Sequence, residues 1–308
     1  MAKSPDRTGA IPDDVRAIVV ELGERCSLAV DGAVLLHQHS NAIVHLPEAG
    51  VVARIATNPD ALERVQGSVR VTRWLAARGF PCTPPADELA EPLRVQGRVV
   101  SLWRYIGATG RRVSGAELGR ILRELHDLST PADPPDRLLD PLRSVDAAAR
   151  DSSGSLDESD RDWLLARIGQ LREAWSAIEP VIPIGLIHGD AHPGNLIPTE
   201  GGAAVLGDWD QVAIGPREWD LTQVHYTRRR FGRPSDEDLQ GFIDEYGWDV
   251  RAWAGADTLI AVREITGLSP YIRNASSDSF AAEEVKGRLG DLRSGDTGAL
   301  WRSPSDRT

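Results

Sequence analysis

The residues best suited to chemistry gather in one segment, 186–210, which reads LIHGDAHPGNLIPTEGGAAVLGDWD. Asp190 follows a short hydrophobic run and precedes Asn195 by five residues, and a second hydrophobic run leads to Asp208. If the two runs pair as a hairpin, these side chains converge at one end of it. Hard oxygen ligands of this kind suit Mg²⁺, which keeps waters and phosphates as its other ligands. Phosphoryl transfer needs little more than metal on the phosphates and a carboxylate beside the attacking hydroxyl.

The same segment carries two histidines, His188 and His192, on either side of Asp190. His and Asp at such short spacing can share a transition metal, as in a hydrolase. That site needs further His or Glu ligands, and three of the seven histidines fall in a predicted sheet near the N-terminus. It also leaves Asn195 and Asp208 without a role, so we favour phosphoryl transfer.

The elements before this segment are predicted to form a small sheet. Three short runs rich in β-branched residues between 31 and 57 predict strands, with a turn at 47–50, and 99–103 predicts another strand. A helix is expected over 60–78, because apolar residues recur there at helical spacing and Gly79 follows. The first hundred residues therefore predict a sheet with one helix packed on it.

From residue 114 onward the pattern is mostly helical. Ser114 and Glu117 form the S-x-x-E pattern of a capping box at a helix N-terminus. Residues 129–158 are rich in Pro, Asp and Ser and predict a connection. Further helices are expected at 164–178 and in three segments between 239 and 292.

In this order, the motifs resemble those of the aminoglycoside phosphotransferase (APH) family, small-molecule relatives of the protein kinases. Residues 188–190 (HGD), followed by Asn195, are similar to the family's H-G-D-x-x-x-x-N catalytic loop. Residues 207–210 (GDWD) resemble its metal-binding I-D-W-E segment, and 215–221 (GPREWDL) resemble the G-x-P-x-x-D-L stretch that follows. The resemblance runs from about residue 30 to about residue 225, and more loosely beyond.

The resemblance implies roles for the residues that match. Asp190 would be the catalytic carboxylate that accepts or orients the proton of the acceptor hydroxyl. Asn195 and Asp208 would bind Mg²⁺. His188 would brace the loop, and Asp220 would hold the loop backbone by hydrogen bonds, which is a structural role.

The resemblance also implies a binding region for the nucleotide, ATP or GTP. Residues from Trp103 to Tyr105 would form the hinge that pairs with the base through backbone groups. The segment 39–41, with Ser40 at its centre, would cover the phosphates. Arg54 stands where the family usually carries a phosphate-gripping Lys, and an Arg can contact phosphate with bidentate geometry.

Two features depart from the common pattern. The helix position that usually pairs with the Lys carries Ser68 instead of Glu, and the nearest acidic residue, Glu63, lies more than a turn earlier. Either the alignment shifts, or Arg54 contacts phosphate without the usual ion pair. The phosphate-covering loop also lacks glycines, which favours the small-molecule branch over the protein kinases.

Composition limits the partners. The net charge of −11 argues against nucleic acid, which is recognised by clustered Lys and Arg, and it is compatible with a cationic acceptor. The run 228–230 (RRR) is interpreted as a solvated helix end. Two cysteines, Cys26 and Cys82, predict no disulfide framework and fit a cytoplasmic location. No run approaches the ~18 apolar residues of a membrane span, no secretory signal is evident, and no obligate protein partner is expected.

Together these expectations describe an α+β protein with a two-lobed, protein-kinase-like fold. A nucleotide-binding N-lobe with a small antiparallel sheet is expected at 13–106 and a mainly helical C-lobe at 107–301, between polar tails at 1–12 and 302–308. The expected function is ATP- or GTP-dependent transfer of the γ-phosphoryl group to a hydroxyl of a small molecule, such as an aminoglycoside or other antibiotic, which would make it a resistance enzyme. The alternative, motivated by the two departures, is a catalytically degenerate protein that binds nucleotide or ligand without turnover.

Overall fold

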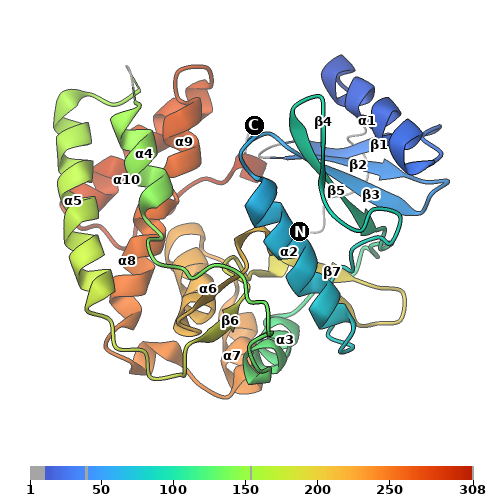
Figure 1. The fold of residues 1–308 in the computed structure, drawn as a ribbon. Helices are drawn as coiled ribbons and strands as arrows, with labels where there is room; N and C mark the ends of the chain where they lie inside the picture. The colour runs from blue at the N-terminus through green and yellow to red at the C-terminus, as the bar shows by residue number, and fades with distance from the viewer. Residues whose placement is uncertain (1–10, 39–40, 153–154, 307–308) are drawn as a thin grey trace. The chain divides into compact units, whose positions relative to one another are not determined.

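The structure is a computed structural model that describes residues 11–38, 41–152 and 155–306 (Figure 1). Most of the tail expected at 1–12 lies outside the described residues, and so does Ser40.

The chain forms two compact units. The first combines the described residues up to Asp136 with His188–Ala213, and the second combines Arg137–Ile187 with the described residues from Ile214 onward. The whole of the segment 188–210 therefore belongs to the first unit. The lobe boundary expected near residue 106 stays a prediction.

The first unit is built on a five-stranded antiparallel sheet, in agreement with the expected α+β class (Figure 1). Its strand order is β1-β2-β3-β5-β4. The predicted strands and the turn at 47–50 are all present, whereas β4 was not predicted because three residues are too few to show a pattern. The strands are β1 Val34–Gln38, β2 Asn41–Leu46, β3 Val51–Ala56, β4 Leu93–Val95 and β5 Arg98–Arg104.

Two helices, not one, accompany this sheet before β5 ends. The predicted helix is α2, Leu62–Ala76. The helix that was not predicted is α1, Asp13–Cys26, whose apolar residues recur at i, i+3, i+4 and i+7. They pack with the buried strand residues in one hydrophobic core, which is why this segment is helical and not part of a tail. They are Val15, Ile18, Val19 and Leu22.

A small hairpin lies within the segment 188–210 of the first unit. Strand β7 (Leu196–Pro198) pairs antiparallel with β8 (Ala204–Leu206). Two hydrogen bonds of Leu206 tie the hairpin to the chain that follows α2. The Leu206 amide donates to the Pro81 carbonyl at 2.8 Å, and the Leu206 carbonyl accepts from the Thr83 amide at 3.1 Å. Two short helical turns, η1 (Pro193–Asn195) before β7 and η2 (Trp209–Gln211) after β8, both lie at the open end of the hairpin.

Helix α3, Gly115–Asp127, begins with the predicted capping box. Ser114 Oγ accepts from the Glu117 amide at 3.2 Å, and the Ser114 amide donates to Glu117 Oε2 at 2.9 Å. Arg111 adds a two-pronged contact, with Nη1 and Nη2 donating to the Glu117 carboxylate at 2.9 and 2.8 Å.

The second unit is mostly helical (Figure 1). Helix α4 lies inside the segment 129–158, which had been expected to be only a connection. Its strands β6 (Gly185–Ile187) and β9 (Ala213–Gly215) pair with each other. The helices are α4 Arg143–Arg150, α5 Glu158–Ser176, α6 Glu218–Phe231, α7 Asp236–Tyr246, η3 Val250–Ala252, α8 Ala256–Thr266, α9 Ser269–Asn274, α10 Ser279–Ser294 and η4 Pro304–Asp306.

The sequence predicted that the arginine run at 228–230 is a solvated helix end, and this prediction is wrong for Arg230. Arg230 is 2% exposed, and its Nε donates to Glu264 Oε1 at 2.7 Å. Its guanidinium also lies over the ring of Trp301. The helix period turns three consecutive residues to different faces, so Arg230 enters the core whereas Arg228 and Arg229 do not.

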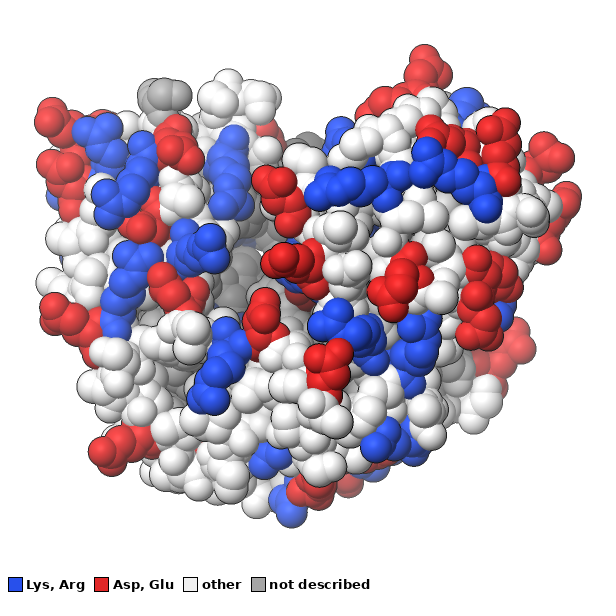
Figure 2. Space-filling model, viewed as in Figure 1, with Lys and Arg blue, Asp and Glu red and all other residues white. Residues whose placement is uncertain are grey.

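The surface charges are mixed on the face that Figure 2 shows, with acidic and basic side chains interspersed over it.

Cys26 and Cys82 are both free thiols, and burial raises the pKa of Cys82 to about 12. Among the described residues, no helix combines the length and the hydrophobicity that a bilayer crossing requires.

Candidate active site

His188 braces the loop that carries Asp190. Its ring is fully buried, and Nε2 lies 2.9 Å from the Gly207 carbonyl oxygen. The Asp190 amide donates to Nδ1 at 3.3 Å. Because a carbonyl only accepts and an amide only donates, the ring is the neutral tautomer with its proton on Nε2. His188 thereby joins the start of the loop to the residue just before Asp208.

Asn195 closes the same loop from its other end. Its Nδ2 donates to the Asp190 carbonyl at 2.9 Å, which leaves Oδ1 as its acceptor atom. The Gly207 amide donates to the Asn195 carbonyl at 2.8 Å. Asp190, Asn195 and Asp208 are therefore joined through a short set of hydrogen bonds within one unit. The hairpin predicted between the two hydrophobic runs is wrong, because the first run (β6) pairs with β9 and the second (β8) pairs with β7.

Gly189 permits this close packing. Its φ is +88°, a conformation that side chains disfavour. A Cβ at this position would lie 2.2 Å from the Gln211 carbonyl oxygen, so the backbone of η2 occupies the space of a side chain. The glycine between His188 and Asp190 is thus required by the approach of the loop to η2.

Asp208 leaves β8 with an unusual backbone. Its φ and ψ are +57° and +62°, in the left-handed region that Asp tolerates better than most residues. Trp209 follows, 1% exposed, with its indole Nε1 donating to the Leu206 carbonyl at 2.9 Å and its ring edge-on to His188. Trp209 packs into the core, and the strained residue before it is directed to the half-exposed side.

Arg54 on β3 meets two carboxylates of this segment. Its Nη2 lies 2.9 Å from Asp208 Oδ1 and 2.5 Å from Asp210 Oδ2. Asp210 Oδ2 also receives Arg64 Nη1 of α2 and Asn41 Nδ2 of β2, each at 3.2 Å. Asp210 is therefore the centre of a cluster that links β2, β3, α2 and η2.

The cluster influences protonation at Asp208. Burial by itself would raise the pKa of this carboxyl, but the charge and hydrogen bond of Arg54 hold it below its ordinary value. The carboxylate stays ionised at neutral pH. An ionised carboxylate is the form that can bind a divalent cation.

The carboxylate that pairs with Arg54 does not come from α2, where the sequence comparison had looked for it. Ser68 is 1% exposed, and its Oγ has no hydrogen-bond partner among the described residues. Glu63 is exposed. Asp210 pairs with Arg54 instead, and sequence reasoning missed it. The signal was present, because the acid two residues after Asp208 matches the Glu of I-D-W-E.

Trp103 and Tyr105, the residues expected to contact the nucleotide base, lie at and just after the end of β5. Trp103 is 8% exposed, with its Nε1 donating to Ser101 Oγ at 3.0 Å. Tyr105 is exposed and stacks on His45. Its amide donates to the Gly50 carbonyl at 3.0 Å, so a base contact at Tyr105 would use its carbonyl oxygen. The hinge role of these residues stays a prediction.

Asp220 lies in the first turn of α6 in the second unit and is fully buried. The expected role, which is to hold the catalytic loop, also stays a prediction. Ser40 lies outside the described residues.

A Mg²⁺ ion fits the donor set at the hairpin end. Asn195 offers its amide oxygen and Asp208 a half-exposed, ionised carboxylate, both hard ligands. Two protein ligands are enough for Mg²⁺ when phosphates and waters supply the rest. Arg54 contacts Oδ1 of Asp208, and Asp210 holds the same guanidinium.

The hydrolase alternative does not fit this geometry. Both ring nitrogens of His188 are used in hydrogen bonds to Gly207 and Asp190 backbone groups. His192 Nδ1 accepts from the Gly194 amide at 3.0 Å, and its Nε2 lies 3.9 Å from Asp190 Oδ2. His188 therefore cannot share a metal with Asp190 and His192.

Comparison with known proteins places this arrangement in a family. The chain resembles the amicoumacin kinase hAmiN, solved with AMP-PNP, Ca²⁺ and Ami, at 14% identity and a TM-score of 0.73, over 95% of this chain and 98% of that one. It also resembles a choline/ethanolamine kinase family protein from Mesorhizobium loti (18%, TM-score 0.61, 90% and 94% covered) and aminoglycoside phosphotransferase APH(3'')-Id from Streptomyces rimosus (18%, TM-score 0.60, 82% and 98% covered). The sequence pattern of the phosphotransferase enzyme family, APH, matches residues 34–258. The chain is thus a member of the APH phosphotransferase family.

Proposed function

We propose that this protein transfers the γ-phosphoryl group of ATP or GTP to a hydroxyl group of a small molecule. The observation that carries the proposal is the hydrogen-bonded loop and hairpin that hold Asp190, Asn195 and Asp208 together in one unit. Family membership supports phosphoryl transfer, and the solved relatives include kinases of small molecules.

In this reaction Asp190 accepts a hydrogen bond from the acceptor hydroxyl and directs its oxygen at the γ-phosphorus. As the new O–P bond forms, the bond to the diphosphate leaving group breaks and the hydroxyl proton passes to Asp190. The products are the phosphorylated acceptor and ADP or GDP. Asn195 and Asp208 would hold Mg²⁺, which would neutralise phosphate charge, and Arg54 would contact the phosphates.

The acceptor class is narrowed by charge. The chain carries a net charge of −11. A cationic acceptor would be attracted to such a chain. Amino sugars and choline-like alcohols are therefore the compounds we expect to react first.

The test is a Mg²⁺-dependent transfer assay with ATP and with GTP over a panel of hydroxyl compounds. The panel contains amicoumacin, spectinomycin, streptomycin, choline and uncharged sugars. Asp190→Ala should lower turnover about 100-fold or more, because a positioned acid or base commonly contributes that much. The matched control is Asp87→Ala, which removes an exposed carboxylate of the same unit that pairs with Arg104.

The outcomes separate the proposal from its alternative. Transfer that Asp190→Ala loses and Asp87→Ala keeps supports the proposal. Full activity of a folded Asp190→Ala protein contradicts it. Binding of Mg-nucleotide with no transfer across the panel favours the non-catalytic alternative, although the two partners found for Arg54 remove one of its motives.

A further inference from the structure

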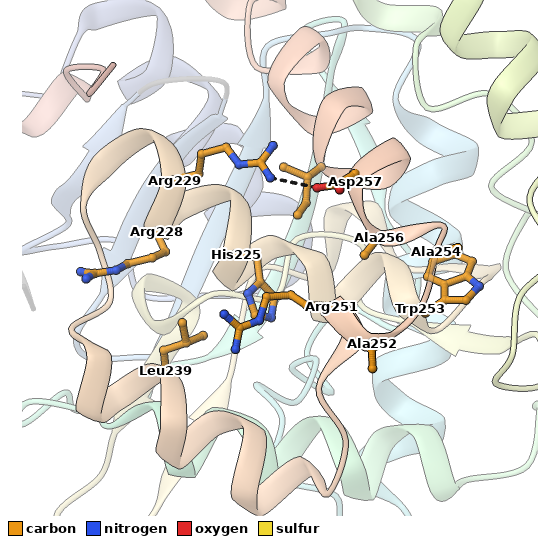
Figure 3. A pocket seen from close by; sticks show the side chains of 11 residues that line it. His225, Arg228, Arg229, Leu239, Arg251, Ala252, Trp253, Ala254, Ala256 and Asp257 are labelled. Atoms are coloured by element: carbon orange, nitrogen blue, oxygen red, sulfur yellow. Dashed lines mark hydrogen bonds and ion pairs between the residues drawn. The ribbon is translucent and has the colours of Figure 1, made fainter. Parts of the chain in front are cut away.

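The second unit contains a cavity of about 580 Å³ that lies wholly within it (Figure 3). This volume falls within the range of roughly 300–1,000 Å³ typical of small-molecule sites. Helix α6 supplies one side, and α7, the segment around η3 and the start of α8 supply the others. The polar lining consists of His225, Arg228, Arg229, Arg251 and Asp257 (Figure 3).

The lining is rich in cationic donors. Three arginines line the cavity, and each pairs with a different carboxylate: Arg228 with Asp236, Arg229 with Asp257 and Arg251 with Asp249. Arg229 pairs with Asp257 at 3.0 Å, and this carboxylate is largely exposed. Arg251 is itself exposed and is held by Asp249, at 2.7 Å, which is outside the lining. Exposed ion pairs are weak, and each guanidinium has five N–H donors, so the arginines can also bind an anionic ligand.

His225 gives an independent indication of a ligand. Its side chain is 6% exposed, and Nε2 has no hydrogen-bond partner among the described residues. The nearest carboxylate oxygen, of Asp249, is 3.9 Å away. A buried polar atom without a partner is costly, and a ligand that supplies the partner offsets that cost.

We propose that this cavity binds a small organic anion, that is, one phosphate or carboxylate group on an apolar body. The anionic group would meet Arg251 and His225, and the apolar body would contact Trp253 and Leu239, which also line the cavity. Guanidinium groups suit both anions because they bind them bidentately. This site gathers arginines on a chain whose net charge is −11, and it does not depend on the phosphotransfer proposal.

Phenyl phosphate and benzoate are the probes for the two anionic groups. Each is titrated into the full chain without Mg²⁺ or nucleotide, and the indole ¹⁵N–¹H signal of Trp253, assigned with Trp253→Phe, reports the cavity. Benzylamine and benzyl alcohol serve as cationic and neutral analogues. We expect a saturable shift with at least one anion and none with benzylamine. The anion that binds more tightly identifies the preferred group.

Variants then locate the contact. Arg251→Gln should weaken binding about tenfold, since a charge-assisted hydrogen bond is lost. Arg167→Gln, on α5, removes the same charge outside the cavity and should leave affinity unchanged. Arg54→Gln removes the proposed phosphate contact of the first unit and should also leave the Trp253 titration unchanged. The last control separates failure here from failure of the phosphotransfer proposal.

His225 provides a signature that a packing effect would not give. Burial, together with the charge of Arg251, lowers the pKa of His225 to about 4, so the ring is neutral at pH 7. Asp249, Arg228, Arg229 and Asp257 are further charged groups around it. A bound anion should raise this pKa, which is measured from the ring ¹H shifts. An unmoved His225 pKa at saturation, equal binding of benzylamine, or unchanged affinity of Arg251→Gln would each overturn the proposal.

Discussion

Arg54 and Asp210 form the pair that gives this site its particular character. Arg54 contacts both Asp208 and Asp210, but Asp208 is also the proposed cation ligand. Asp210 also holds the guanidinium of Arg54, and Asn41 and Arg64 fix Asp210 in turn. We therefore regard Asp210 as a positioning residue for phosphate contact.

Replacing Asp210 should affect the nucleotide more than the chemical step. In Asp210→Ala the KM for ATP or GTP should rise about tenfold, the equivalent of one charge-assisted hydrogen bond, with a smaller change in kcat. Asp210→Glu restores the acid of I-D-W-E and should keep most of the affinity. Steady-state kinetics with varied nucleotide measure both. An unchanged KM in Asp210→Ala, or equal losses in both variants, would refute the positioning role.

At the scale of the element, the capping box of α3 is reinforced by an arginine that precedes the helix. Glu117 closes the capping box and also receives Arg111. The hydrogen bond from Arg111, against the opposing effect of burial, and the contacts with Ser114 lower the pKa of Glu117 to about 2. A lowered carboxyl pKa stabilises the folded state above the ordinary value of 4.5, and this contribution is lost as the pH falls towards 2.

Glu117→Gln should therefore lower the free energy of unfolding by about 1 kcal/mol at pH 7, since the charge of one hydrogen-bonded partner is removed. The difference from the unchanged protein should shrink between pH 4.5 and pH 2. Denaturant unfolding at pH 7, 4 and 2.5 measures it. Glu124→Gln, an exposed carboxylate on the same helix, is the control and should change stability by less than about 0.5 kcal/mol. A Glu117→Gln deficit that persists at pH 2.5 would contradict the assignment.

For the whole molecule, nucleotide binding should be visible as stability. A ligand present at a hundredfold excess over its Kd stabilises the folded state by about 2.7 kcal/mol. Mg-ATP or Mg-GTP should thus raise the Tm, and EDTA should reduce the increase because the proposed Mg²⁺ would link phosphate to Asn195 and Asp208. Arg54→Ala should reduce it as well. A thermal shift that neither EDTA nor Arg54→Ala diminishes would place the nucleotide elsewhere.

The sequence by itself determined the chemistry-bearing segment and most elements around it. His188, Asp190, Asn195 and Asp208 lie within about twenty residues of one another. Each β-branched run of β1, β2 and β3, and the capping box of α3, spans fewer residues still. Patterns of this kind are local, so backbone propensity and residue spacing suffice to predict them. The apolar periodicity of α1 was also sufficient to predict a helix, but the sequence analysis missed it because it follows a polar tail.

Only the tertiary structure decided which residues meet across the chain. Arg54 and Asp210 are 156 positions apart, and their pairing depends on how the β7–β8 hairpin packs beside β3. The burial of Arg230 and the cavity that holds His225 depend likewise on how α6, α7 and α8 pack. Periodicity gives the face of a helix but not the neighbour that the face will meet, because that neighbour is chosen by the packing of all elements together.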